Sequence, residues 1–251
     1  MPRFFLSESF SENYQGVMPE QIVMTGEDAF HLSVSLRSRI GDQVTLCTSD
    51  GVEIFCEISC ISGGKKNPEV VFTPLHHQVS LSESPVKITV FQGMPKGKKT
   101  DTVLQKCTEL GADRIVFVYT DRSLPVYTPG EEKTERYQRI ADEAAKQCGR
   151  GKLVSVGVYP NLEAALSEMK QNDLVFACYE NEEQMSLRGL LAKKPYGSAA
   201  FLIGPEGGIS EREVKLLQEE NIPTVTLGNR ILRTETASGA VLAMFLYENE
   251  L

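Results

Sequence analysis

Hydrophobic and polar positions alternate in short runs along the first 72 residues, a pattern typical of half-buried strands. The predicted strands are Ile22–Met24, Val44–Cys47 and Val52–Ile58. Asp50-Gly51 predicts a tight hairpin turn between the last two, because glycine readily adopts a positive φ. A short helix is expected over Glu27–Arg39. Together these elements predict a small β-barrel or sandwich.

From residue 86 the pattern changes to strands alternating with helices. The predicted strands are Val86–Phe91, Arg114–Tyr119, Leu153–Tyr159, Asp173–Tyr179 and Ala199–Ile203. The predicted helices are Asp101–Leu110, Glu131–Cys148, Leu162–Lys170 and Gln184–Ala192. Such alternation indicates an α/β domain with a mainly parallel sheet flanked by helices. Because prolines and polar residues gather between 72 and 85, the predicted domains are 1–72 and 73–251.

Two glycine-containing loops near the C-terminus each follow a short apolar strand and precede a helix. The first covers 204–208, and Ser210 with Glu213 predicts a capping box at the start of the next helix. The second covers 228–236, before an apolar helix expected over Ala237–Tyr247. Since parallel strands end at one edge of their sheet, we expect both loops to form one pocket. The chain contains neither the GxGxxG nor the GxxxxGK[ST] phosphate-binding motif.

Composition restricts the class of protein. The chain is 41% apolar and 24% charged, and its six cysteines include no CxxC pair, so no metal site is expected. No apolar run approaches the roughly 20 residues that span a bilayer, and the first residues lack a secretory signal. These features predict a cytoplasmic protein with no membrane contact.

The charge distribution is uneven. The net charge is −8, but residues 92–152 carry 12 Lys and Arg against 9 Asp and Glu. Lys96, Lys98 and Lys99 follow one predicted strand, and Arg122 follows the next. A local basic surface of this kind can hold a polyanion, although a solvated surface of mixed charge is the alternative.

Several motifs resemble one known family. The segment Ile203-Gly204-Pro205-Glu206-Gly207-Gly208, together with 227–237, is similar to the RsmE family of small-subunit (16S) ribosomal RNA uridine-N3 methyltransferases. Pro95-Lys96-Gly97, Thr108–Gly111 and the N-terminal His31 also resemble that family. The resemblance extends over essentially the whole chain. One departure is Asn229, where many members carry proline.

The resemblance implies a fold and partners beyond those read from the pattern. It implies an N-terminal PUA-like β-barrel and a C-terminal SPOUT domain whose chain forms a trefoil knot. It also implies S-adenosylmethionine as methyl donor, with S-adenosylhomocysteine as product, and a homodimer. The RNA partner would be 16S ribosomal RNA, within the assembled small subunit.

The chemistry of this reaction suggests residue roles, and the resemblance adds the cofactor contacts. Arg233, with Arg230 second, would stabilise the anion formed when uracil N3 loses its proton. Glu235 would position Arg233 or accept the proton, and an uncharged base acting through water is the alternative. The expected cofactor-binding residues are Tyr179, Ile203, Gly204, Glu206, Gly208, Leu227, Gly228, Ile231, Leu232, Thr236 and Ala237. The expected RNA-binding residues are Arg3, Arg37, Lys96, Lys98, Lys99, Arg122 and Arg150.

The sequence leaves three alternative functions open. A related SPOUT enzyme would keep fold and cofactor but methylate transfer RNA or a ribose hydroxyl. A non-catalytic RNA-binding factor would keep the pocket without the reaction. A metabolic α/β enzyme would bind a small acidic or nucleotide substrate, but the missing phosphate-binding motifs count against it.

Overall fold

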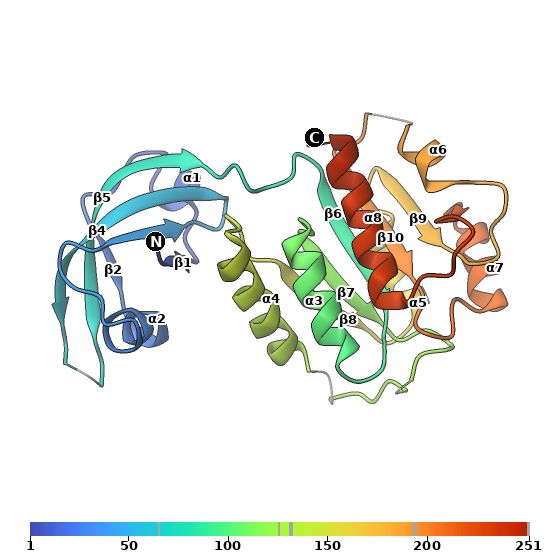
Figure 1. Ribbon diagram of the computed structural model, residues 1–251, viewed down its shortest axis with the longest axis horizontal. Helices are drawn as coiled ribbons and strands as arrows, with labels where there is room; N and C mark the ends of the chain where they lie inside the picture. The colour runs from blue at the N-terminus through green and yellow to red at the C-terminus, as the bar shows by residue number, and fades with distance from the viewer. Residues whose placement is uncertain (65, 125, 131–132, 193–194, 250–251) are drawn as a thin grey trace. The chain divides into compact units, whose positions relative to one another are not determined.

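The computed structural model describes residues 1–64, 66–124, 126–130, 133–192 and 195–249 (Figure 1). The chain divides into two compact units, residues 1–83 with 146–153 and residues 84–145 with 154–251. The first stretch ends at Glu83, within the predicted boundary region of 72–85 but later than residue 72, because a strand that begins at Glu69 continues to Val79. The first unit also recruits a segment from the middle of the chain, which the linear division could not anticipate.

The first unit contains one curled sheet that resembles half a barrel. Its elements are β1 Arg3–Phe5, α1 Phe10–Asn13, β2 Ile22–Met24, α2 Gly26–Phe30, the π-helical turn η1 His31–Ser35, β3 Gln43–Cys47, β4 Val52–Ser62 and β5 Glu69–Val79. The strand order is β1-β3-β4-β5-β2, with β1 parallel to β3 and the other pairs antiparallel. Two register shifts between β4 and β5 bend the sheet around its core.

The helix expected over Glu27–Arg39 is shorter in the structure. It ends in η1 at Ser35, and Arg37 adopts a positive φ of 57°. A residue in this left-handed region cannot continue a right-handed helix, so the backbone turns away before Arg39.

The second unit has a fully parallel six-stranded sheet, as the strand–helix alternation predicted. Its strands are β6 Lys87–Gly93, β7 Arg114–Val118, β8 Ser155–Tyr159, β9 Leu174–Cys178, β10 Ser198–Ile203 and β11 Thr224–Val225. The order is β11-β9-β10-β6-β7-β8, and every neighbouring pair is parallel. All strands therefore end at the same edge, which carries the loops discussed below.

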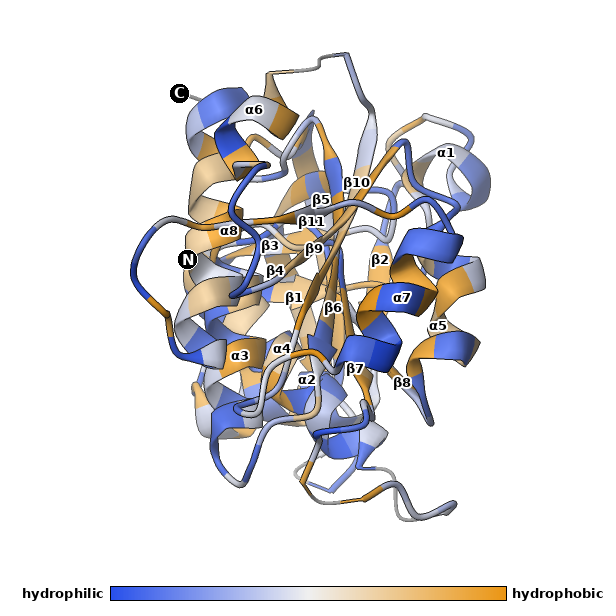
Figure 2. Cartoon of the chain, turned by 90° about the vertical axis from the view of Figure 1, so that its right-hand side faces the viewer, coloured by the Kyte–Doolittle hydropathy of each residue, from blue (hydrophilic) through white to orange (hydrophobic). Residues whose placement is uncertain are grey.

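Helices cover both faces of this sheet. They are α3 Lys99–Glu109, α4 Thr134–Cys148, α5 Leu162–Met169, α6 Leu187–Leu191, α7 Glu211–Glu219 and α8 Thr234–Asn249. Residues of α3, α4, α6 and α8 pack on one face with Ile88 and Val90, while α5 and α7 pack on the other with Phe91. Figure 2 shows the central strands β6 and β10 in the colours of hydrophobic residues, as burial on both faces requires.

Several helix boundaries differ from the predicted ones: α3 begins at Lys99, two residues early, and α6 begins at Leu187, three residues late. α4 begins at Thr134, and the expected start at residue 131 lies outside the described residues. α8 begins at Thr234, three residues before the predicted Ala237. Among the described residues no helix is long and apolar enough to cross a membrane.

Candidate functional site

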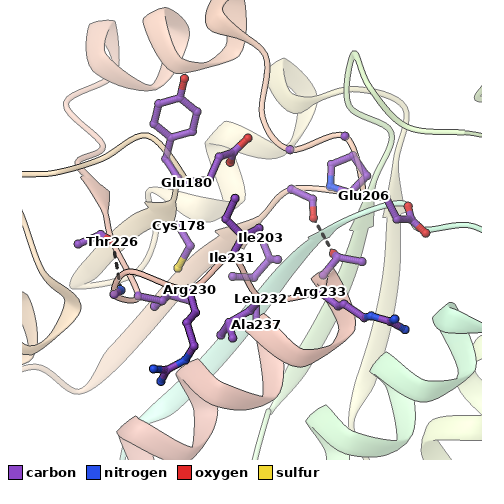
Figure 3. Close-up of a pocket in the computed structure, with 18 of the residues that line it drawn as sticks. Cys178, Glu180, Ile203, Glu206, Thr226, Arg230, Ile231, Leu232, Arg233 and Ala237 are labelled. Atoms are coloured by element: carbon purple, nitrogen blue, oxygen red, sulfur yellow. Dashed lines mark hydrogen bonds between the residues drawn. The ribbon is translucent and has the colours of Figure 1, made fainter.

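A cavity of about 490 Å³ lies in the second unit, where the loops after β9, β10 and β11 meet (Figure 3). Of the residues expected to bind the cofactor, those that line it are Tyr179, Ile203, Gly204, Glu206, Gly208, Leu227, Gly228, Ile231, Leu232 and Ala237. Thr236 is the exception: it is exposed on the first turn of α8 and does not line the cavity. The two glycine-containing loops thus form one pocket, as their strand-end positions predicted.

The loop after β10 is a tight turn with no room for larger residues. A Cβ atom on Gly204 would lie 2.8 Å from the carbonyl carbon of Gly208, and one on Gly93 would lie 2.5 Å from Cδ of Pro205. Gly208 has a φ of +72°, and its N–H donates to the carbonyl of Pro205 at 2.9 Å. These glycines let the main chain itself form the cavity wall.

The helix after this loop begins where the sequence predicted. Ser210 Oγ accepts from the Glu213 N–H, and Glu213 Oε2 accepts from the Ser210 N–H, which completes the capping box. Glu213 is fully buried, and its other oxygen accepts from the Asp121 N–H at 2.9 Å. The cap therefore also attaches α7 to the loop after β7.

Beneath the pocket lies a buried polar network centred on Gln92. The Gln92 amide donates to Thr234 Oγ1 at 2.7 Å and to the carbonyls of Gly93 and Gly204 at 3.0 and 3.4 Å. Thr234 Oγ1 donates to the same Gly204 carbonyl at 2.6 Å, and Ser238 Oγ donates to Gln92 Oε1. The network joins β6, the loop after β10 and the first turn of α8.

Gln92, Thr234 and Ser238 were not among the predicted site residues, although the sequence contains signals for them. Gln92 is a polar residue at the end of an apolar strand, and Thr234 and Ser238 are polar at a spacing of four within an apolar helix. Polar side chains buried in such positions need partners, which here are one another.

Arg233 directly precedes α8 at the cavity. Its carbonyl accepts from the N–H groups of Thr236 and Ala237 at 2.9 and 2.8 Å, so its own side chain lies at the positive end of the helix dipole. Arg230 also lines the cavity, and Figure 3 shows the two side chains leaving the loop in different directions. Both arginines are exposed, which leaves their charge available to a substrate.

Lys99 connects the two sides of the site. Its ammonium lies 2.8 Å from Glu206 Oε1 and 3.7 Å from Glu235 Oε2. The hydrogen bond to Glu206 raises the pKa of Lys99. Burial alone would raise the pKa of Glu206, but hydrogen bonds from Lys99 and from backbone N–H groups lower it below its ordinary value. Lys99, expected to contact RNA, thus contacts two carboxylates, of which Glu206 lines the cavity.

Glu235 does not line the cavity. Its side chain is 16% exposed, and its Oε2 accepts no hydrogen bond from the described residues. The nearest cation to that oxygen is the Lys99 ammonium. Glu235 therefore contacts Lys99, whereas it was expected to position Arg233 or to accept the proton.

Two further lining residues, Cys178 and Glu180, come from the end of β9 and were not selected from the sequence. Burial raises the pKa of the Cys178 thiol, so it stays protonated and is a weak nucleophile. Glu180 is exposed to the cavity. The rule that strand ends line the pocket could have found both.

The remaining residues expected to bind RNA fall into two groups. Lys96, Lys98, Arg122 and Arg37 are exposed, and Arg122 donates to the Gly207 carbonyl at 2.8 Å. Arg150 differs, because its side chain is only 4% exposed and donates to both carboxylate oxygens of Glu83. A guanidinium buried in this way does not fit a phosphate contact, so the expectation for Arg150 is corrected.

Arg3 lies in the same buried cluster as Arg150. Its guanidinium donates to Glu53 Oε1 at 2.7 Å and to the Arg150 carbonyl at 3.1 Å. Burial opposes the charge of Arg3, but the hydrogen bond to Glu53 outweighs it and raises the pKa of Arg3. These contacts give Arg3 a structural role within the first unit.

The donor set of the cavity fits S-adenosylmethionine. Its volume lies within the roughly 300–1,000 Å³ usual for small-ligand sites. Apolar Ile203, Leu227 and Leu232 suit an adenine ring, and exposed main-chain and charged groups suit the ribose and amino-acid parts. Among the described residues no group of three His, Cys, Asp or Glu side chains could hold a metal ion.

Comparison with known proteins gives consistent matches. Residues 82–246 match the family model described as RNA methyltransferase domain. The ribosomal RNA small subunit methyltransferase E of Bacillus subtilis is 33% identical over 235 residues, which is 91% of this chain and 90% of the relative.

Two solved structures are similar over nearly the whole chain. One is a ribosomal RNA small subunit methyltransferase E from Neisseria gonorrhoeae bound to S-adenosylmethionine, with a TM-score of 0.81, 29% identity and coverage of 98% and 97%. The other is a methyltransferase from Legionella pneumophila with bound S-adenosylmethionine, with a TM-score of 0.81, 27% identity and coverage of 98% and 96%. The resemblance found in the sequence motifs is thereby confirmed. The chain belongs to the RNA methyltransferase family, within the group named ribosomal RNA small subunit methyltransferase E.

Proposed function

We propose that this enzyme transfers the methyl group of S-adenosylmethionine to N3 of a uridine in small-subunit (16S) ribosomal RNA. The observation that carries the proposal is the cavity at the carboxyl ends of β9, β10 and β11, with Arg233 at the start of α8 beside it. Open parallel sheets bind their ligands at this edge. S-adenosylmethionine, when bound, supplies a methyl group activated by its sulfonium.

The protein's part is to hold a uracil and stabilise its anion. N3 lies on the pairing edge of the base, so the uridine must be unpaired and turned into the pocket. Loss of the N3 proton leaves negative charge spread over the ring. The Arg233 guanidinium and the N-terminus of α8 both favour that charge, and Arg230 adds a second exposed cation.

We assign Glu235 a positioning role. Its carboxylate and that of Glu206 flank the Lys99 ammonium, which ties the first turn of α8 to the loop after β10. The N3 proton is then accepted by another group that reaches the base, either directly or through a water molecule.

We further infer the finer features that the family resemblance implies. The first unit would be a PUA-like RNA-binding module, and the second a knotted SPOUT domain that forms a homodimer. Exposed apolar residues late in α8, including Met244 and Tyr247, support a protein partner on that helix. The exposed Lys96, Lys98, Arg122 and Arg37 would contact RNA phosphates, and the enzyme would act in the cytoplasm on the assembled subunit.

The proposal is tested by nucleoside mass spectrometry. Small ribosomal subunits lacking the modification are incubated with the enzyme and S-adenosylmethionine, in parallel with naked 16S RNA. Formation of 3-methyluridine in the subunits, but not with the Arg233→Ala variant, is expected. A methylated ribose or a different methylated base would contradict the N3 assignment.

A further inference from the structure

Glu180 is a carboxylate that lines the cavity without any internal role. It lies two residues after the end of β9 and is exposed. In the part of the chain that the structure describes, it forms no hydrogen bond and no ion pair. The other carboxylate lining the cavity, Glu206, differs because it holds the Lys99 ammonium at 2.8 Å. Glu180 is therefore available to a ligand.

The glycine-containing loop makes room for this carboxylate. A Cβ atom on Gly208 would lie 2.1 Å from Glu180 Oε1 and 2.9 Å from its carboxylate carbon. The Glu180 carboxylate thus lies directly against the bare α-carbon of Gly208, at the end of the neighbouring strand β10. Figure 3 shows Glu180 across the pocket from Arg230 and Ala237.

This placement has a chemical counterpart in nucleotide-binding α/β folds. There, an acidic residue at the end of a strand beside a glycine-rich loop accepts hydrogen bonds from ribose hydroxyls. A carboxylate accepts but never donates, and an adjacent pair of hydroxyls supplies two donors to it. On the basis of the proposed function, we propose that Glu180 binds the ribose 2′ and 3′ hydroxyls of S-adenosylmethionine.

The charges around the cavity favour the ribose over the amino-acid part as the partner of Glu180. The α-carboxylate of the methionine part is attracted to Arg230 and to the N-terminus of α8, which lie on the opposite side. Glu180 would repel that carboxylate. The α-ammonium is bonded to the same carbon as that carboxylate and so stays with it on the arginine side, which leaves the uncharged diol as the donor group for Glu180.

Binding by isothermal titration calorimetry tests the assignment without turnover. The full chain, its Glu180→Gln variant and a Glu183→Gln control are titrated with S-adenosylhomocysteine and with 5′-methylthioadenosine, which has the ribose but no amino-acid part. Glu183 is exposed on the same loop and does not line the cavity. We expect Glu180→Gln to weaken both ligands by about 10-fold, because charged acceptors form the stronger hydrogen bonds. Glu183→Gln should bind both as the parent does.

Two further ligands make the test specific to the diol. The parent protein should bind the 2′-deoxy and 3′-deoxy forms of S-adenosylhomocysteine more weakly than S-adenosylhomocysteine itself. The Glu180→Gln change should then reduce the affinity for these deoxy forms by a smaller factor than it reduces the affinity for S-adenosylhomocysteine. Unchanged binding of 5′-methylthioadenosine to Glu180→Gln, with loss for S-adenosylhomocysteine alone, would assign Glu180 to the ammonium and overturn the proposal. Equal affinity of parent and variant for every ligand would also overturn it. If the parent protein bound none of these ligands, the proposed function itself would fail.

Discussion

Arg233 combines two sources of positive potential at one point of the cavity. Its own charge is exposed, and its carbonyl receives the first hydrogen bonds of α8, so the helix dipole adds to it. Arg230, three residues earlier, lacks the second source. This difference supports Arg233 as the residue that faces the developing uracil anion.

Replacing Arg233 by alanine should lower kcat by about 100- to 1,000-fold, as loss of a transition-state charge contact does. The Kd for S-adenosylmethionine should change little, because the charge acts on the acceptor base. Single-turnover kinetics and cofactor titration measure the two effects separately. Arg233→Lys, which keeps the charge, serves as the control, and equal losses in kcat and cofactor affinity would contradict the assignment.

Among the helices and strands, the side-chain amide of Gln92 joins three elements around the pocket: β6, the loop after β10 and α8. Gln92 at the end of β6 bonds to α8 through Thr234 and Ser238 and to the loop after β10 through Gly204. These partners are separated by more than a hundred residues in the sequence. Their pairing depends on how the strands are ordered, which local periodicity does not encode.

The Gln92→Leu variant should lower the free energy of unfolding by about 1–3 kcal/mol, because it leaves buried polar groups unpaired. Urea denaturation measures the difference. The matched control is Gln218→Leu on the outer side of α7, where Gln218 is exposed and the change should stay within about 0.5 kcal/mol. Equal stability of Gln92→Leu and the parent would show that the network can rearrange.

In the first unit, the Asp50 carboxylate organises the segment around α1. It accepts from the N–H groups of Phe10 and Ser11 at 2.8 and 3.0 Å and from Thr48 Oγ1 at 2.6 Å. Burial alone would raise the pKa of Asp50, but these hydrogen bonds outweigh it and hold the pKa well below the ordinary value. Asp50 was predicted only as part of a hairpin turn.

The pKa of Asp50 is lower in the folded protein than in the unfolded chain, so the ionised carboxylate stabilises the fold. This stabilisation is fully present above the unfolded-state pKa of about 3.9 and is lost as the pH falls below that value. The unfolding free energy of Asp50→Asn should therefore fall less steeply than that of the parent between about pH 5 and pH 2. Denaturation series across this range measure the slope. Glu20→Gln, at an exposed position, should leave the slope unchanged. Identical slopes for Asp50→Asn and the parent would refute the role of Asp50.

Across the whole molecule, sequence patterns predicted the parallel sheet because its strands are apolar on both faces and separated by amphipathic helices. They missed β5 altogether, and in its outer half Leu75, His76 and Val79 are exposed so that burial no longer alternates. They also missed β1, which is only three residues long. The pocket was predicted well from glycines at strand ends, whereas the burial of Arg150 required contacts with Glu83 that are distant in sequence.

The exposed lysines provide a whole-molecule prediction for RNA binding. Lys98→Ala should reduce the slope of log affinity against log salt by about 1, since one phosphate contact is lost. Filter binding to 16S RNA between low and physiological salt measures it. Lys215→Ala, at an exposed position on α7, is the control and should keep the parent slope. The same slope for Lys98→Ala would mean that Lys98 does not touch RNA.

The segment 146–153 has a consequence for modularity. The chain leaves the first unit after Glu83 and returns to it at Lys146, near the end of α4. It leaves the first unit again after Leu153, five residues beyond the end of that helix at Cys148. A gene fragment that stops at residue 83 would encode a unit without Arg150, so the Glu83 carboxylate and the Arg3 guanidinium would lose a shared partner. A fragment that starts at residue 84 would carry that arginine without the Glu83 carboxylate. Neither unit therefore corresponds to one uninterrupted stretch of the chain, and a cut at a single position separates neither of them whole.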